Sequence, residues 1–318
     1  MYQNVMVPLD GSPFSEQALP LALDIARTGG ATLRLTYVQL PVSSIYSEAP
    51  LFLADEIESH VIERERSRWL DYLEGVAARI RKAAPGVMVV TSVQEGNPAE
   101  SLQKEAIATG ADLVVMTTHA RGALARLWLG SVADELLRHL PIPLLLVRPS
   151  ADAPEITAKV LPKLILIPLD GTPLAEQMIR PAVELGKLAH AGFTLLRIVK
   201  PVLALSPPPP GGTSMGQMAS EMVERLQSVQ DELRKEALAY LEKVAAPLRE
   251  QGLHVLTRVA FEEQPALGVL HEAEAEGVGI VALATHGRRG LARLVLGSVA
   301  DKVVRGAKLP VLLCRPKA

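Results

Sequence analysis

Short apolar runs alternate along this chain with longer stretches in which apolar residues recur every three or four positions. The short runs are rich in β-branched residues and predict strands over Asn4–Pro8, Thr32–Tyr37, Val87–Ser92, Asp112–Thr117 and Leu144–Val147. The periodic stretches predict helices over Pro13–Thr28, Asp55–Ala84, Pro98–Thr109 and Ser131–His139. The alternation then returns, with strands expected at Lys163–Pro168, Thr194–Val199, His254–Val259, Gly279–Ala284 and Val311–Cys314.

Strands that alternate with helices are typical of βαβ units and a parallel sheet. Four of the runs are almost wholly apolar, as expected for strands covered on both faces: Leu113–Met116, Leu144–Val147, Ile280–Ala284 and Val311–Leu313. We therefore expect an α/β fold in which each half is a doubly wound, five-strand parallel sheet. The long helices Asp55–Ala84 and Gln217–Gln251 are expected to cover the sheet with one face and to expose the other.

The chain is a duplication. Val7–Pro13 recurs as Ile167–Pro173, and Pro143–Pro149 returns as Pro310–Pro316. Thr118–Asp134 recurs as Thr285–Asp301 with 13 of 17 positions identical, where chance would give about one. The repeats predict two copies of one domain, at 1–150 and 160–318, joined by a short linker. The run of prolines within Ser206–Gly212 predicts a stiff surface loop.

The fifth strand of each copy is short, apolar and last in its sheet, so its edge needs cover. The two copies can provide that cover for each other by pairing their last strands within one chain. Two such chains associating as a homodimer is a further arrangement that the pattern leaves open.

Composition excludes several classes of function. The 33 Lys and Arg residues are balanced by 35 Asp and Glu, and aromatic residues make up only 3%, so no basic surface or stacking platform for nucleic acid is expected. The single cysteine, Cys314, excludes a disulfide framework and is expected in the core. The histidines lack metal-ligand spacing. Neither a signal peptide nor a membrane-spanning run is visible, which predicts a cytoplasmic protein without membrane contact.

Two loops in each copy carry the candidate chemistry. An Asp-Gly-Ser/Thr-Pro turn leaves the first strand, and a Thr-His-x-Arg segment leaves the fourth and runs on to Gly-Ser at a helix start. In doubly wound sheets, ligands bind at the carboxyl ends of strands where the winding reverses. Glycine permits positive φ and close approach of a ligand, and a helix N-terminus attracts phosphate. The loop is also basic, through Arg121 and Arg126 in one copy and Arg288, Arg289 and Arg293 in the other.

The Gly-Ser helix start can also be interpreted without any ligand. Ser131-x-x-Asp134 and Ser298-x-x-Asp301 have the spacing of capping boxes, in which the serine serves only its own helix. Other nucleotide motifs are absent: no Gly-x4-Gly-Lys-Ser/Thr string occurs, and no Gly-x-Gly-x-x-Gly follows the first strand. No arrangement of nucleophile and base is indicated, so no catalytic residue is expected.

Together, the Pro-x-Asp-Gly-Ser turn, the Thr-His-x-Arg segment and Leu-Gly-Ser-Val-Ala resemble the universal stress protein family, over essentially the whole chain as two tandem domains. The resemblance implies an adenine-nucleotide alpha-hydrolase-like fold with strand order 3-2-1-4-5. It also implies ATP, with or without Mg²⁺, held between strands one and four with its phosphates on the Gly-Ser turn. The residues implied in the C-terminal copy are Pro168, Asp170, Gly171, Thr172, Val199, Ala284, His286, Gly287, Arg288, Gly297, Ser298 and Val299. Their weaker counterparts in the N-terminal copy are Pro8, Asp10, Gly11, Ser12, Val38, Thr117, His119, Arg121, Gly130, Ser131 and Val132.

The two copies depart from the family's Gly-x2-Gly-x9-Gly-Ser/Thr motif to different degrees. Ala284 and Thr117 stand in place of the first glycine, and the N-terminal copy also has Ala120 where the C-terminal copy keeps Gly287. We therefore expect an ATP-binding stress-response regulatory protein whose C-terminal copy is the better site. A nucleotide-free interaction or scaffold protein, and a slow ATPase, are the alternatives.

Overall fold

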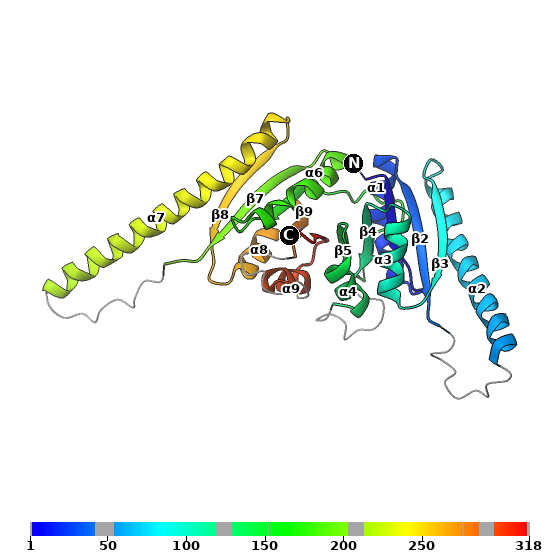
Figure 1. Ribbon diagram of the computed structural model, residues 1–318. Helices are drawn as coiled ribbons and strands as arrows, with labels where there is room; N and C mark the ends of the chain where they lie inside the picture. Colours follow the sequence, from blue (N-terminus) through cyan, green and yellow to red (C-terminus); the bar gives the residue numbers. More distant parts are fainter. Residues whose placement is uncertain are drawn as a thin grey trace.

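The computed structural model describes residues 2–41, 54–118, 129–151, 153–202, 213–275, 277–285 and 296–316, with the backbone alone for 54–61 and 213–220. Within these ranges the strands form one sheet of ten (Figure 1). The strands of the N-terminal half are β1 (Asn4–Pro8), β2 (Thr32–Gln39), β3 (Val89–Glu95), β4 (Leu113–Thr117) and β5 (Leu144–Val147). Those of the C-terminal half are β6 (Leu164–Pro168), β7 (Gly192–Val199), β8 (Val255–Phe261), β9 (Val278–Ala284) and β10 (Val311–Cys314).

The strand order across the sheet is β3-β2-β1-β4-β5-β10-β9-β6-β7-β8. Each half therefore has the order 3-2-1-4-5 with parallel neighbours, which confirms the predicted α/β fold. The halves meet where β5 and β10 pair antiparallel, with Leu144 opposite Leu313 and Leu146 opposite Val311. The two exposed last strands thus cover each other within one chain, as the sequence predicts.

Helices cover both faces of the sheet. The short 3₁₀ helix η1 (Ser15–Ala18) leads into the N-terminal helices α1 (Leu19–Gly29), α2 (Ala54–Ala83), α3 (Pro98–Ala108) and α4 (Ser131–His139). The C-terminal helices are α5 (Pro173–Glu176), α6 (Ile179–Ala189), α7 (Thr213–Glu250), α8 (Pro265–Ala273) and α9 (Ser298–Gly306). One buried cluster joins α1, α2, α6 and α7 to the sheet, and a second joins α3, α4, α8 and α9 to it. Neighbouring residues of β1 divide between the clusters, Val5 and Val7 in the first and Met6 in the second, because side chains alternate along a strand.

The helix predicted over Pro13–Thr28 is wrong as a single element. It is divided into η1 and α1, with Pro20 in the first turn of α1. Proline has no N–H to donate and is tolerated in the first turn of a helix rather than in its interior. Strands β2, β3 and β8 extend two or three residues past their predicted ends, because their ladders continue to the pairs Gln39–Glu95 and Val199–Phe261.

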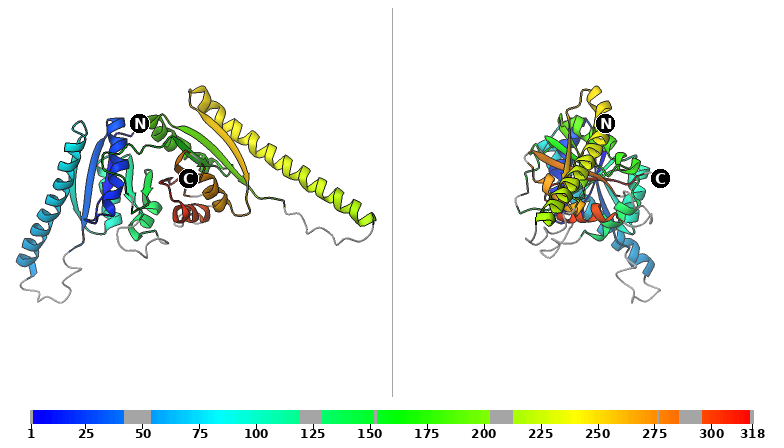
Figure 2. Two further views of the ribbon diagram at one scale, coloured as in Figure 1. Left: turned by 180° about the vertical axis from the view of Figure 1, so that it is seen from behind. Right: turned by 90° about the vertical axis from the view of Figure 1, so that its left-hand side faces the viewer.

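The two long helices cover the sheet only with their C-terminal parts, which corrects the expectation for the whole of α7. Ala237, Leu241, Ala245 and Leu248 are buried, whereas none of the residues from 221 to 236 is. Figures 1 and 2 show the beginning of α7 extending past β8 and clear of the other helices. The predicted loop at Ser206–Gly212 lies outside the described residues.

Candidate functional site

The turn after the first strand has the same geometry in both halves. Asp10 Oδ1 accepts hydrogen bonds from the Ser12 amide at 3.0 Å and the Ser12 hydroxyl at 2.6 Å. Asp170 Oδ1 accepts the corresponding two bonds from Thr172, again at 3.0 and 2.6 Å. The intervening glycines, Gly11 and Gly171, have φ of +80° and +81°, where a Cβ is strained. Each turn is therefore closed by its own aspartate and requires its glycine.

The second candidate loop is anchored at both ends. In the C-terminal half, the Gly297 amide donates to the Thr285 carbonyl at 2.7 Å, and the Thr285 amide donates to the Cys314 carbonyl at 2.9 Å. In the N-terminal half the Gly130 amide bonds Thr118 in the same way, at 2.9 Å. β6 pairs with both β7 and β9, and α5 contacts β9, so the strand-one turn and the loop anchor lie at one edge of the sheet. The structure thus places the strand-one turn of each half at the same edge as the described end residues of the second loop.

The helices that follow these loops begin without a side-chain cap. The N-caps of α4 and α9 are Gly130 and Gly297. Within the described ranges, no side chain accepts a hydrogen bond from the amides of residues 131–133 or 298–300. Unpaired first-turn amides and the positive end of the helix dipole both favour an anion. Val132 and Val299 pack against the core, so they can offer a ligand only their backbone.

The capping-box interpretation is wrong, because the N-cap lies one residue before the serine. Ser131 and Ser298 are the first residues inside their helices and not the N-caps, so a box would need its acid at Ala133 or Ala300. The aspartates instead pair along the helix: Asp134 binds Arg138 at 2.8 Å, and Asp301 binds Arg305 at 2.8 Å.

The glycine N-caps are not explained by backbone conformation. Gly130 and Gly297 have φ of −61° and −58°, which any residue can adopt. Of the two reasons given by the sequence for glycine here, positive φ is therefore excluded. Close approach of another group to the backbone stays a prediction.

The strand-two candidates of the two halves are not equivalent positions. The register aligns Pro8 with Thr36 and Pro168 with Leu196, so Val38 corresponds to Ile198 and not to Val199. Val38 and Ile198 both pack against the cluster shared with α4 and α9. Val199 follows Ile198 and points to the other face. The equivalent of Val38 in the C-terminal half is therefore Ile198, which aligning the repeats at the offset of β1 identifies.

Different side chains support the strand-one turn from behind in the two halves. Trp69 of α2 stacks on Tyr37 at 4.0 Å between ring centroids and lies against Gly11, where a Cβ would come within 2.7 Å of the indole. In the C-terminal half Arg197 donates to the Leu169 carbonyl at 3.1 Å and lies over the Tyr240 ring. These supports belong to the α1/α2 and α6/α7 face, away from the loops that follow β4 and β9.

A half-buried tyrosine is repeated behind each turn. Tyr72 donates to Glu16, and Tyr240 donates to Glu176, both at 2.9 Å. Burial, followed by the neighbouring carboxylate, raises the pKa of both phenols well above the ordinary value. Both tyrosines therefore stay protonated donors at neutral pH, and they hold the long helix to the segment that follows the turn.

Five of the predicted site residues lie outside the described residues: His119, Arg121, His286, Gly287 and Arg288. The described ones occupy the positions given above, with Thr117 buried and Pro8, Pro168 and Ala284 half-buried at strand ends.

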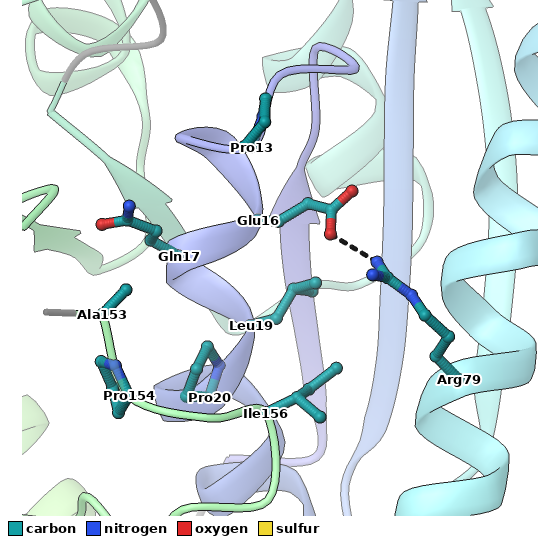
Figure 3. Close-up of a pocket in the computed structure, with 9 residues that line it drawn as sticks. All are labelled: Pro13, Glu16, Gln17, Leu19, Pro20, Arg79, Ala153, Pro154 and Ile156. Carbon is teal, nitrogen blue, oxygen red and sulfur yellow. Dashed lines mark hydrogen bonds and ion pairs between the residues drawn. The ribbon is translucent and has the colours of Figure 1, made fainter. Parts of the chain in front are cut away.

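A pocket of about 200 Å³ lies between α1, α2 and the linker (Figure 3). It is lined by Pro13, Glu16, Gln17, Leu19, Pro20, Arg79, Ala153, Pro154 and Ile156. Glu16 and Arg79 form an ion pair at its rim. None of the predicted nucleotide residues lines this pocket.

Searches of the described ranges give two further findings. No group of three or more His, Cys, Asp or Glu side chains among them is placed to hold a metal ion. No helix in the same ranges combines the length and the apolar character needed to cross a membrane.

Comparison with known proteins gives a consistent result. The sequence model of the Universal stress protein family matches residues 1–148 and 162–315. A universal stress protein of Mycolicibacterium smegmatis is 26% identical over 99% of this chain and 97% of its own length. One from Thermus aquaticus is 30% identical and matches 46% of this chain over its full length.

A solved structure shares the fold across both halves. The crystal structure of a universal stress protein from Archaeoglobus fulgidus superimposes with a TM-score of 0.64 at 15% identity, and covers 98% of this chain and 96% of that one. With the family's sequence model matching both halves, this chain belongs to the universal stress protein family as a two-copy member.

Proposed function

We propose that this protein binds ATP as a regulatory member of its family, and that the C-terminal half is the better site. The observation that carries the proposal is the uncapped start of α9, which is anchored beside the Asp170 turn. A triphosphate there would receive hydrogen bonds from the first-turn amides, and the glycine N-cap would leave room for its oxygens.

The preference for the C-terminal half rests on two positions. Where the family motif has its first glycine, the C-terminal half has Ala284 and the N-terminal half has the bulkier, buried Thr117. The C-terminal half also keeps Gly287, whereas the N-terminal half has Ala120. Each replacement adds side-chain atoms to a loop that must approach the phosphates closely.

A regulatory role is supported by the position of the loop relative to the junction. The Thr285 amide bonds the Cys314 carbonyl of β10, and β10 pairs directly with β5 of the other half. A change in the loop on nucleotide binding would therefore reach, through a single hydrogen bond, the β5–β10 pair that joins the halves (the β5–β10 seam). Any such effect requires that the two halves can adopt two relative arrangements and that ATP binds one of them more tightly than the other.

Isothermal calorimetry with ATP tests the site. The Gly297→Glu/Ser298→Ala variant places a carboxylate where the phosphates would bind and should remove most nucleotide binding. The matched Gly130→Glu/Ser131→Ala variant should cost much less. Thermal unfolding without ligand controls for misfolding. Unchanged stoichiometry in the first variant would refute the assignment to the C-terminal half.

Two measurements separate the alternatives. Mass spectrometry of small molecules released from freshly purified protein should detect adenine nucleotide, and its absence together with no binding by calorimetry would favour an interaction protein. Steady-state phosphate release that is abolished by the Gly297→Glu/Ser298→Ala substitutions would identify a slow ATPase.

A further inference from the structure

Residues 221–236 of α7 include an apolar stripe, none of whose members is buried by the part of the chain that the structure describes. The stripe has spacings of four, three and four residues, as on one side of a helix, and consists of Met222, Leu226, Val229 and Leu233. Met222 is 49% exposed and Val229 is 50% exposed, whereas Leu226 and Leu233 are half-buried. α7 contacts β8 and β7; its buried residues begin at Ala237, and Arg234 lies over the ring of Phe261 in β8.

The sister helix α2 differs from α7 at the two leucine positions of this stripe. Tyr72, Glu74 and Arg81 of α2 make the same contacts as Tyr240, Glu242 and Arg249 of α7, which aligns the two helices. At that alignment the counterparts of Leu226 and Leu233 are Glu58 and Glu65. The duplicated helix therefore has acidic residues at the two leucine positions, whereas Val61 stands at the position of Val229.

We propose that this stripe of α7 is a docking surface for α7 of a second copy of the chain, in antiparallel orientation. An axis near Val229 would place the stripe against itself, with Met222 near the far end of the other stripe. Knobs-into-holes packing of such a stripe would remove its side chains from water.

Charge selects the antiparallel orientation. No described residue forms an ion pair with Arg225, which flanks the stripe. Antiparallel pairing about Val229 brings Arg225 of one copy beside Glu232 of the other, a residue otherwise held only by exposed Lys235. Parallel pairing would instead place Arg225 beside the neutral Gln230 of the other copy and would leave its charge uncompensated.

The length of the stripe sets the strength of the association. Met222 to Leu233 spans about 17 Å of helix. One face of so short a segment buries less surface than the roughly 1,200 Å² that a stable interface needs. The self-association is therefore weak and depends on concentration, and it leaves the β5–β10 seam inside each chain unchanged.

Disulfide capture tests the geometry, because the only natural cysteine, Cys314, is buried. Val229→Cys should give a disulfide-linked dimer at least about tenfold faster than Ser228→Cys, which lies at the neighbouring position outside the stripe. Differently tagged Arg225→Cys and Glu232→Cys chains should form the mixed disulfide in preference to either like pair. Preferential Arg225→Cys self-linkage would refute the antiparallel orientation.

Sedimentation of the full chain tests the association itself. The wild type should show a rising average mass with concentration. The Leu226→Glu/Leu233→Glu variant, which copies the residues of α2, should remain monomeric with an unchanged unfolding temperature. A wild type that is monomeric throughout, or equal cross-linking of Val229→Cys and Ser228→Cys, would overturn the proposal and leave the stripe to a different class of partner.

Discussion

The guanidinium of Arg315 donates a 2.5 Å hydrogen bond to the backbone carbonyl of Arg138, across the junction between the two halves. Arg148, the equivalent residue of the other half, donates to the carbonyls of Arg305 and Ala307, at 3.3 and 2.9 Å. Each half thus places a cation at the C-terminal end of the other half's last helix, where free carbonyls and the helix dipole favour positive charge. The contact is reciprocal because the two copies face each other across the β5–β10 pair.

Replacing Arg315 with Met should weaken the junction. The variant keeps much of the aliphatic stem but loses a charge-assisted hydrogen bond, which is worth about 1.5–3 kcal/mol. We expect a lower urea midpoint with an unchanged slope. Arg148→Met should give a loss of similar size, because it removes the mirror contact. A midpoint equal to that of the wild type in both variants would show that the seam is held by strand pairing alone.

Gly11→Ala should destabilise the N-terminal half more than an alanine substitution at a positive-φ glycine with free space around it. The residue has φ of +80°, and its new Cβ would lie 2.7 Å from the Trp69 ring. Backbone strain of about 1–2 kcal/mol is then joined by displacement of the indole. Gly30→Ala is the matched control, since Gly30 has φ of +66° with no atom near the Cβ position. Equal losses of unfolding free energy in the two variants would contradict the role of Trp69.

Asp24 is expected to hold the linker against α1. Its carboxylate is 3% exposed, accepts the amides of Val160 and Leu161 at 2.7 and 2.9 Å, and pairs with Arg27. Asp24→Ala leaves these donors without an acceptor and should cost about 2–4 kcal/mol. Limited proteolysis should then cut the linker faster, whereas Asp24→Asn, which keeps one acceptor oxygen, should lose less. Unchanged cleavage in Asp24→Ala would count against this role.

The Cys314 thiol should be inert in the folded protein. Burial raises the pKa of this thiol to about 12. An unfolded thiol ionises above about pH 9, so the unfolded state releases its proton first and stability falls as pH rises from about 9 towards 12. The urea midpoint of wild type relative to Cys314→Val should decline in that window. Rapid labelling of the native protein by a thiol reagent near pH 8 would contradict this burial.

Periodicity located most elements well, and its errors have local causes. The helix Ser131–His139 has the predicted bounds, because both its apolar period and its breaker residues lie within the segment. The predicted Pro13–Thr28 helix is divided because Pro20 is tolerated only in the first turn of a helix. The sequence itself shows this proline, so the division could have been predicted. The extra length of β2 and β3 has a different cause. Gln39 and Glu95 are in strands because they pair with each other across the ladder, and not because of an intrinsic strand propensity.

The candidate site was only partly readable from the chain. The repeated Asp-Gly-Ser/Thr turn and the Gly-Ser helix start were found from the duplication, and the structure places them at one edge of each half. The spacing Ser-x-x-Asp fitted both a capping box and an uncapped helix. The choice depended on whether Gly130 or Ser131 occupies the N-cap, which is a matter of backbone geometry.

The amino-acid sequence alone determined the duplication, the element order and the two-sided covering of the strands, because these follow from patterns repeated within short segments. Tertiary structure decided the antiparallel orientation and register of the β5–β10 pair, the exchange of Arg148 and Arg315 between halves, and where the buried part of α7 begins. Those features depend on residues far apart in the chain coming together. An apolar period records that a side chain needs a partner, and only the folded chain shows which partners are present.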